Sequence, residues 1–225
     1  MRIGAVITAG GLGKRIGGEV PKQLIKLHGK AVWRHSAETF LKHEKIEAVV
    51  LTVPEDWQSY FAEEARDLSI IVAIGGNERW QSVRNGVNAL PEGISHAMVH
   101  DAARPFISKD IISNVAKVLE HSCCMVAKPV FDTVKIAENG FVKSTLDRST
   151  LWLAQTPQAV PVALLKELYE KMEGIPDFCP TDEASILEKF GIPIKIVEGH
   201  SKNNKITTKE DIANFLSLMP NSNKP

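Results

Sequence analysis

The sequence predicts an α/β fold with a mostly parallel sheet that is covered by helices on both faces. Two observations carry this prediction. Apolar, β-branched runs alternate along the chain with amphipathic runs of helical spacing, and the strand-like runs are apolar at nearly every position, as expected of strands buried on both faces. At 225 residues the chain can form one sizeable core but hardly two. We therefore expect a single domain over residues 1–225.

The first half of the chain shows this alternation most regularly. Its predicted strands and helices begin with a buried run, continue through a short hairpin, and then alternate strictly. In chain order they are a strand at 2–8, a hairpin at 24–32, a helix at 33–42, a strand at 46–53, a helix at 57–68, a strand at 70–74, a helix at 80–89, a strand at 97–100, a helix at 109–121 and a strand at 124–128.

A break in the alternation predicts an inserted β-arm at about residues 130–155. Residues 130–136 alternate apolar and polar side chains, Asn139-Gly140 offers a tight turn, and residues 141–146 form a return strand. Asn-Gly between two such runs is a strong hairpin signal. Because a two-stranded ribbon alone is marginal in water, the hairpin either folds onto its own sheet or grips a second copy of the chain.

The α/β pattern then resumes, with helices at 161–172 and 182–190, a strand at 193–197 and a last helix that starts at Thr208. Thr208 and Asp211 suit a capping box for that helix. The segment TDEAS (181–185) is typical of a helix start, because acidic side chains are favourable in the first turn. We interpret TDEAS as structural.

Charge and hydropathy exclude two classes of partner. Lys plus Arg equals Asp plus Glu, at 27 each, so no overall field attracts the chain to nucleic acid or to a membrane surface. No apolar run approaches the roughly 18 residues of a spanning helix. A strand is predicted almost at the first residue, so we expect no targeting segment. Any affinity for anions must therefore be local.

Such a local site is indicated where the first strand runs into AGGLGKRIGGEVPKQ (9–23). Glycines allow backbone N–H groups to approach an anion closely, and the cations Lys14, Arg15 and Lys22 follow. A Walker A loop would need Ser or Thr where Arg15 stands, and a dinucleotide fingerprint would need a third glycine where Ile16 stands. The segment predicts a phosphate site of another kind, although a plain strand-to-helix turn would also explain the glycines.

Other polar clusters follow later strands, and the carboxyl ends of parallel strands share one edge of a sheet. In GGNERWQSV (75–83) the glycines can read a base edge, while Arg79 either meets a phosphate or caps a surface. In HDAARP (100–105) Asp101 either binds a metal or hydroxyls, or pairs structurally with Arg104. No nucleophile–base pair stands out. The remaining chemistry is phosphoryl or nucleotidyl transfer, in which catalysis is largely positioning and charge neutralisation.

Taken together, these segments resemble the 2-C-methyl-D-erythritol 4-phosphate cytidylyltransferase family. The resemblance covers nearly the whole chain, and nine segments in the same order make it specific. They are AGGLGKR, PKQ, GGNERWQSV, VHDAARPF, PVFDTVK, LDRSTLW, QTPQ, TDEAS and NNKIT. The resemblance implies a three-layer α/β/α, Rossmann-like fold and a cytoplasmic homodimer joined by the arm. It also implies magnesium as cofactor, and attack by a polyol phosphate on the α-phosphorus of CTP.

The resemblance also implies roles for individual residues. Arg15 and Lys22 would stabilise the transition state, and Arg148 and Lys205 would position the polyol phosphate. Arg148 and Thr156 would serve the partner's site, and Thr133 and Arg104 would touch the polyol phosphate. Asp101 would hold hydroxyls and lie near the metal, and Gly76, Asn77 and Ser82 would read cytosine. The remaining residues expected to bind substrate are Ala9, Gly10, Gly11, Gly13, Arg79 and Ala102.

The chain departs from the family pattern at three places. The family usually has AAG where Ala9-Gly10-Gly11 stands, aspartate where Asn77 stands, and methionine where Ile16 stands. The related ribitol 5-phosphate cytidylyltransferases therefore stay open as an alternative, although TDEAS favours the methylerythritol enzymes. A nucleotide-binding module without catalysis is a further alternative, but such a module should lose Arg15, Lys22 or Asp101.

Overall fold

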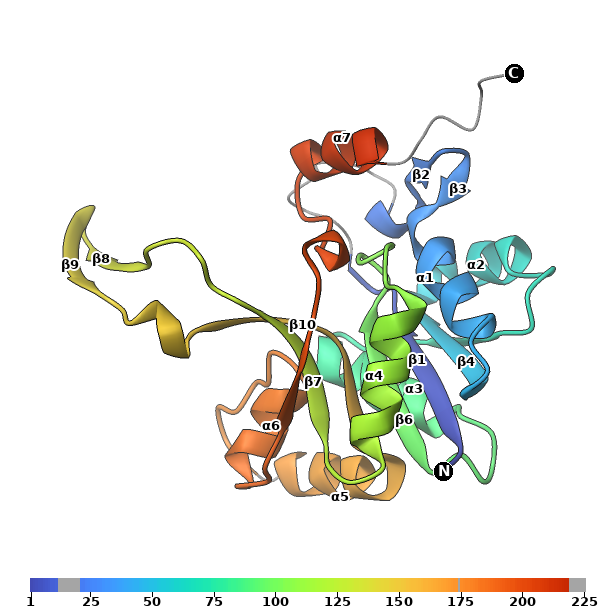
Figure 1. Ribbon diagram of the computed structural model, residues 1–225. Helices are drawn as coiled ribbons and strands as arrows, with labels where there is room; N and C mark the ends of the chain where they lie inside the picture. The colour runs from blue at the N-terminus through green and yellow to red at the C-terminus, as the bar shows by residue number, and fades with distance from the viewer. Residues whose placement is uncertain (12–20, 174, 219–225) are drawn as a thin grey trace.

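A seven-stranded sheet forms the centre of the computed structural model, which describes residues 1–11, 21–173 and 175–218 (Figure 1). The strand order is β11-β7-β10-β6-β1-β4-β5, and every neighbouring pair is parallel except those that involve β10. The strands are β1 (Ile3–Thr8), β4 (Ile46–Val53), β5 (Ile71–Ile74), β6 (His96–Asp101), β7 (Cys124–Pro129), β10 (Trp152–Pro161) and β11 (Lys195–Glu198). The predicted mostly parallel sheet is confirmed.

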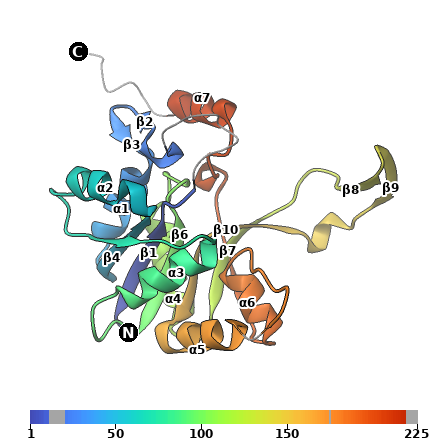
Figure 2. The ribbon, with the colours of Figure 1, turned by 180° about the vertical axis from the view of Figure 1, so that it is seen from behind.

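Helices cover both faces of this sheet, as predicted (Figures 1 and 2). Ile3, Ala5 and Ile7 of β1 pack in the cluster of α1 (Val32–Leu41), α2 (Gln58–Glu64) and α4 (Lys109–Leu119), whereas Val6 belongs to a second cluster with three further helices. Those three are α3 (Arg79–Asn88), α5 (Val162–Glu173) and α6 (Glu183–Lys189). Alternate side chains of one strand thus enter two cores. No helix of the described residues has the length and apolar character needed to cross a membrane.

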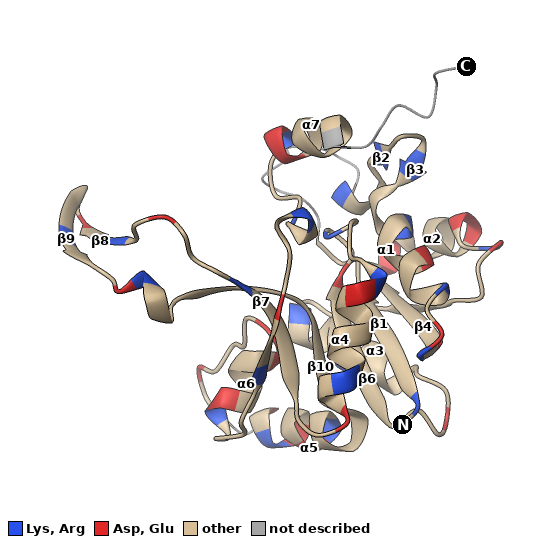
Figure 3. Cartoon of the chain, in the orientation of Figure 1, with Lys and Arg blue, Asp and Glu red and all other residues tan. Residues whose placement is uncertain are grey.

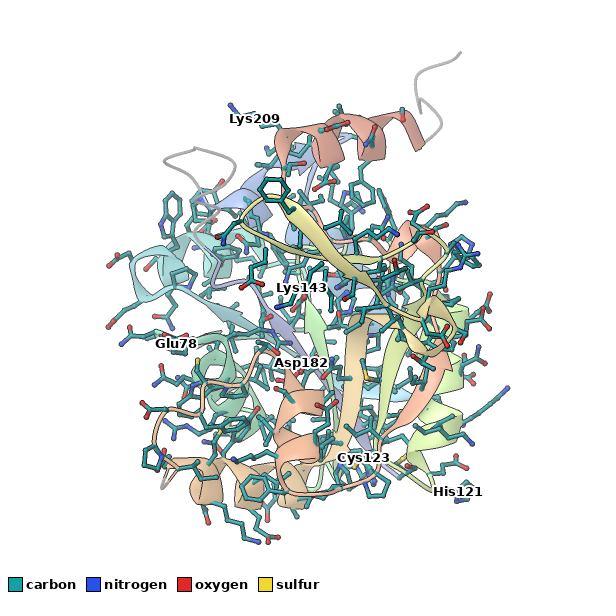
Figure 4. All side chains as sticks on the ribbon, turned by 90° about the vertical axis from the view of Figure 1, so that its left-hand side faces the viewer. Glu78, His121, Cys123, Lys143, Asp182 and Lys209 are labelled. Atoms are coloured by element: carbon teal, nitrogen blue, oxygen red, sulfur yellow. The ribbon has the colours of Figure 1, made fainter. Side chains whose placement is uncertain are left out.

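A smaller layer lies beyond the carboxyl ends of the strands. It contains the hairpin of β2 (Lys26–Leu27) and β3 (Lys30–Ala31) together with α7 (Lys209–Leu218), joined by a small apolar cluster around Phe215. Figure 4 shows Lys209 of α7 at one end of the molecule and Cys123, just before β7, at the other. The predicted capping box of α7 is confirmed: Asp211 N donates to Thr208 Oγ1 at 3.2 Å, and Thr208 N donates to Asp211 Oδ2 at 2.8 Å.

The strand β10 is absent from the sequence-based prediction, which left residues 147–160 without a strand. It lies between β6 and β7 in the interior of the sheet and is antiparallel to both. Its middle reads Gln155-Thr156-Pro157-Gln158, a polar run with a proline that does not resemble a buried strand. In the structure Gln158 is buried because Asp182 Oδ2 accepts from its Nε2 and Ala184 N donates to its Oε1, both at 2.8 Å. Satisfied polar groups can occupy a core.

The predicted arm forms a separate two-stranded sheet of β8 (Lys135–Glu138) and β9 (Phe141–Thr145). Asn139 and Gly140 have φ values of 52° and 83°, the positive angles that a two-residue type I′ turn requires. The arm extends away from the central sheet (Figures 1 and 2), and in Figure 4, where Lys143 marks it, it points toward the viewer. The alternative of a hairpin folded onto its own sheet is therefore wrong.

One stability prediction arises in α1. Glu38 accepts hydrogen bonds from Lys30 (2.8 Å), Arg34 (3.0 Å) and Lys42 (3.3 Å). Partial burial tends to raise the pKa of Glu38, but these three cations outweigh burial and lower the pKa to about 2. The folded state then gains stability above the unfolded pKa of about 4.3 and loses it as pH falls toward 2.

We expect Glu38→Gln to lower the free energy of unfolding by on the order of 2 kcal/mol at pH 7, allowing for solvent screening. The difference should shrink steadily between about pH 4.5 and pH 2. Urea denaturation of both proteins across this range measures it. A difference that stayed constant down to pH 2 would contradict the assigned ion pairs.

Candidate active site

A cavity of about 230 Å³ opens at the carboxyl edge of the sheet, where the sequence predicted a ligand site. Five segments that are distant in the sequence build it: the end of β1 with Gly10 and Gly11, the pair Lys22-Gln23, the β5–α3 turn with the start of α3, the end of β6 with Ala103, and Lys205 before α7. The lining residues are Thr8, Gly10, Gly11, Lys22, Gln23, Gly76, Asn77, Glu78, Arg79, Ser82, Asp101, Ala103 and Lys205.

Two of the predicted cations meet at this cavity. Lys22 stands at the start of the short 3₁₀ helix η1 (Lys22–Leu24), and its Nζ donates to Ile206 O at 2.9 Å. Ile206 follows Lys205 directly, so this bond connects the glycine-rich segment to the segment before α7. The apolar contacts of Ile206 with Leu27, Val32 and Phe215 hold that segment in place. Arg15 and Gly13, which the resemblance also assigns to the site, lie outside the described residues.

Asp101 ends β6 with a buried carboxylate that three cations surround. Lys205 Nζ lies 2.9 Å from Oδ2, Arg104 Nε lies 3.6 Å from Oδ2, and Arg79 Nε lies 3.3 Å from Oδ1. Burial tends to raise the pKa of Asp101, but the charges of Arg79, Lys205 and Arg104 outweigh it and hold the pKa well below its ordinary value. The carboxylate is therefore ionised at neutral pH. The Asp101–Arg104 pair exists, and Asp101 also lines the cavity.

Glu183 contacts the site through Arg79, and the sequence pattern did not indicate this contact. Its side chain is 0% exposed, and its two oxygens accept from Arg79 NH1 at 2.9 Å and NH2 at 3.1 Å. Burial tends to lower the pKa of Arg79, but the charges of Glu183 and Asp101 outweigh it and raise the pKa. The interpretation of TDEAS as a helix start is correct for Asp182, which caps α6. Only the tertiary contact with Arg79 marks out Glu183.

A second, smaller cavity of about 140 Å³ adjoins the first and shares Arg79, Asp101 and Lys205 with it. Thr156 and Arg104 line it as well. Two adjoining cavities with common charged residues can hold two reactants side by side. This arrangement suits a transfer between two bound molecules.

Thr156 is buried, and its Oγ1 accepts from Asp101 N at 3.1 Å. Thr156 lines the second cavity of its own chain, and its role at a partner's site stays a prediction. Arg104 donates through NH1 to Asn203 O at 2.9 Å and through NH2 to Ala154 O at 3.3 Å. It thus ties β10 to the segment that carries Lys205.

The turn expected to read a base follows β5 and leads into α3. Ser82 Oγ accepts from Gly76 N at 3.0 Å, and Glu78 and Gln81 cap α3 reciprocally. A Cβ on Gly76 would lie 2.3 Å from the Cβ of Gln81, so this tight turn requires glycine. Because Ser82 bonds within the turn, it shapes the turn that Gly76 and Asn77 present to the cavity.

Four residues assigned by resemblance do not line either cavity. Ala9 and Ala102 are buried, and their N–H groups donate to Thr52 O at 2.7 Å and Thr8 O at 3.0 Å. At β6 it is Ala103 that lines the first cavity. Thr133 and Arg148 lie on the exposed arm, where Arg148 NH1 donates to Phe131 O. The structure does not bring these two arm residues to the cavity of their own chain.

The donor set around Asp101 suits a metal ion that arrives with phosphates. In the described part of the chain no three His, Cys, Asp or Glu side chains cluster as a metal cage. Magnesium is commonly held by one or two carboxylates, with waters and substrate phosphates as its other ligands. Glu78 also lines this cavity, and the ionised carboxylate of Asp101 fits that pattern. It does not fit a metal ion held by protein ligands alone.

The fold and the site define an α/β protein that binds a phosphorylated ligand beyond the carboxyl ends of its strands, with cations and a carboxylate arranged for group transfer. Comparison with known proteins gives the family. Residues 3–219 match the family model described as 2-C-methyl-D-erythritol 4-phosphate cytidylyltransferase. The chain therefore belongs to the 2-C-methyl-D-erythritol 4-phosphate cytidylyltransferase family.

Individual relatives agree with the family model. The enzyme of that name from Microcystis aeruginosa is 39% identical over 92% of this chain and 94% of its own length. The one from Geobacter metallireducens is 36% identical over 94% of this chain and 95% of its own length. Among solved structures, a 4-diphosphocytidyl-2C-methyl-D-erythritol synthase from Anaerococcus prevotii has a TM-score of 0.84 at 29% identity, covering 96% of this chain and 95% of that one.

Proposed function

We propose that this chain transfers a cytidylyl group from CTP to 2-C-methyl-D-erythritol 4-phosphate, a step of isoprenoid biosynthesis, and releases pyrophosphate. Family membership supports the choice of substrates. The observation that carries the chemistry is the pair of adjoining cavities that share Asp101, Arg79 and Lys205. We assign CTP to the larger cavity, next to the turn of Gly76 and Asn77, and the polyol phosphate to the smaller one.

The reaction needs no covalent intermediate with the protein. A phosphate oxygen of the polyol attacks the α-phosphorus of CTP, and the bond between the α-phosphorus and the bridging oxygen breaks, so that pyrophosphate leaves with that electron pair. Negative charge gathers around the α-phosphorus as the transition state forms. Lys22 and Lys205 are already positioned at the cavity, so they stabilise that charge without reorganising. Arg15 would add a further cation.

Magnesium is part of this proposal, as an ion that CTP brings and that Asp101 helps to hold. When bound, it would neutralise charge on the triphosphate and on the leaving pyrophosphate. Asp101 also lies where it can accept hydrogen bonds from hydroxyls of the ribose or the polyol. A cytoplasmic location remains a prediction from the sequence.

Pyrophosphate release tests the proposal. The purified protein is given CTP and magnesium with either 2-C-methyl-D-erythritol 4-phosphate or ribitol 5-phosphate as acceptor. We expect release only with the methylerythritol substrate. Activity only with ribitol 5-phosphate would establish the related polyol phosphate enzyme instead, and silence with both acceptors would favour a nucleotide-binding module without catalysis.

The arm supports a homodimer as a further part of the proposal. Its apolar side chains are strongly exposed, with Phe131 78%, Phe141 79% and Val142 67% accessible. Apolar patches of this kind mark interaction surfaces, and a lone ribbon needs something to pack on. Thr133 and Arg148 lie exposed on the same arm, which supports the prediction that Arg148 serves a partner's site.

We expect Phe141→Asp to convert a dimer into a monomer, because a charge on the arm cannot be buried unpaired against a partner. Analytical ultracentrifugation measures the mass directly. Glu138→Gln on the same exposed ribbon is the matched control and should stay dimeric. A wild-type protein that sediments as a monomer would disprove the arm-mediated dimer.

A further inference from the structure

Glu183 is a buried carboxylate for which the reaction described above has no role. It begins α6, one residue after the capping residue Asp182, and no part of its side chain is exposed. Burying a carboxylate is costly unless it is paired and hydrogen-bonded. Here the pairing is complete: both oxygens accept from the guanidinium of Arg79, at 2.9 and 3.1 Å, in the bidentate geometry that gives the strongest and most directional ion pairs.

Arg79 extends this pairing into the site. The third guanidinium nitrogen, Nε, donates to Asp101 Oδ1 at 3.3 Å. The planar guanidinium of Arg79 therefore bridges the carboxylates of Glu183 in α6 and Asp101 in β6. Arg79 also lines both cavities. A side chain that lies between the two cavities affects how both reactants are placed. Its position depends on Glu183, which holds two of its three nitrogens.

The bridge gives the two oxygens of Asp101 different partners. Oδ1 faces Arg79, while Oδ2 faces Lys205 Nζ at 2.9 Å. Glu183, Arg79, Asp101 and Lys205 therefore form a continuous row of ion pairs from α6 through the site to the segment before α7. The charges alternate along this row, and Arg104, whose Nε lies 3.6 Å from Asp101 Oδ2, adds a further cation beside it.

We propose that Glu183 is a positioning residue for the transfer reaction, an inference that rests on the proposed function. By holding Arg79 it fixes the orientation of Asp101, and through Asp101 it holds Lys205 at the boundary of the two cavities. It also balances the charge of Arg79. Without Glu183, Arg79 competes with Lys205 for Asp101, and a surplus positive charge attracts the triphosphate before the reaction starts. Substrate binding then gains while the transition state loses its aligned cation.

A purely structural role makes a different prediction. If Glu183 only joins α6 to α3 by a buried ion pair, its loss lowers the melting temperature and leaves the kinetic constants of the folded enzyme unchanged. Glu38 provides the matched control, because it too is a shielded glutamate that binds an arginine, Arg34, at 3.0 Å, but on α1 and away from both cavities. Glu38→Gln should lower stability without changing kcat or KM.

The test compares Glu183→Gln with wild type and with Glu38→Gln, well below their melting temperatures. We expect kcat of Glu183→Gln to fall roughly 10- to 100-fold, since small misplacements of reacting groups cost that much. Calorimetry should show CTP binding roughly threefold tighter or more, because a charge released near phosphates strengthens their binding. A kcat within twofold of wild type, with only a lower melting temperature, would overturn the inference.

Two further measurements keep the result interpretable. If Glu183→Gln does not fold, the double variant Arg79→Gln/Glu183→Gln replaces it, because removing both charges leaves no unpaired ion in the interior. The double variant should show the same loss of kcat. A double variant with the kcat of wild type would overturn the inference. If wild type forms no product with either polyol phosphate, the proposed function fails by itself. CTP binding then decides the matter: tighter binding by Glu183→Gln supports the positioning role, and unchanged binding refutes it.

Discussion

Lys22→Ala should lower kcat roughly 10²–10³-fold, the loss expected when one donor is removed from a preorganised site. Lys22 lines the larger cavity and is held next to Lys205 by its bond to Ile206 O. A cation fixed at that place stabilises charge that develops at the α-phosphorus, so kcat should suffer more than CTP binding does. Steady-state kinetics of pyrophosphate release, with CTP varied, separates the two effects.

The matched control for this variant is Lys26→Ala, which removes an exposed lysine four residues further along, in β2. It should keep the kinetic constants of wild type. Near-full turnover by Lys22→Ala would show that Lys22 is an ordinary surface cation and that the charge at the α-phosphorus is stabilised elsewhere.

Asp101→Asn should harm both stability and turnover. The substitution removes the one carboxylate that Lys205 and Arg104 share and leaves these cations close together in a partly buried site. Breaking a buried ion pair from one side costs about 3–5 kcal/mol. Lys205 also loses the partner that holds it at 2.9 Å, so we expect kcat to fall by roughly 10²-fold.

Chemical denaturation gives the stability of Asp101→Asn, and assays at a temperature where the variant is fully folded give its kcat. Asp110→Asn, an exposed acid in the first turn of α4, is the control and should resemble wild type in both. Unchanged turnover by folded Asp101→Asn would remove Asp101 from the mechanism. The surrounding cations would then have to be positioned by other contacts.

The sequence predicted those parts of the fold that depend on local pattern. The apolar run of β1 and the Asn139-Gly140 turn each carry their signal within a few residues, and the structure confirms both. The same is true of the cap of α7. The prediction failed at β10, because Gln155, Thr156 and Gln158 are buried through hydrogen bonds to residues far along the chain. Periodicity of hydrophobic residues does not register such contacts.

The residues of the site also divide into those that the sequence predicted and those that it did not. The rule that ligands bind beyond the carboxyl ends of parallel strands predicted that the glycine segment, Asp101 and the β5–α3 turn would meet, and they line one cavity. The rule says nothing about Glu183, whose partner Arg79 is 104 residues away in the sequence. Ala9 and Ala102 were assigned by resemblance, but the structure commits their N–H groups to backbone carbonyls of neighbouring strands.

The charges that select an anionic substrate are those at the cavity, not those of the whole protein. Figure 3 shows basic and acidic residues spread over the whole molecule, in agreement with a net charge of zero. The cations of the site come from separate segments that the sheet and the layer of α7 bring together. Selectivity for an anionic substrate therefore depends on this convergence and not on the overall field of the protein.

A crystal structure with an unreactive α,β-methylene analogue of CTP tests this convergence most directly. The account predicts the triphosphate in the larger cavity, with Nζ of Lys22 and of Lys205 within hydrogen-bonding distance of its oxygens and the base against the turn of Gly76 and Asn77. A triphosphate bound outside the cavity, or both lysines directed away from it, would contradict the account.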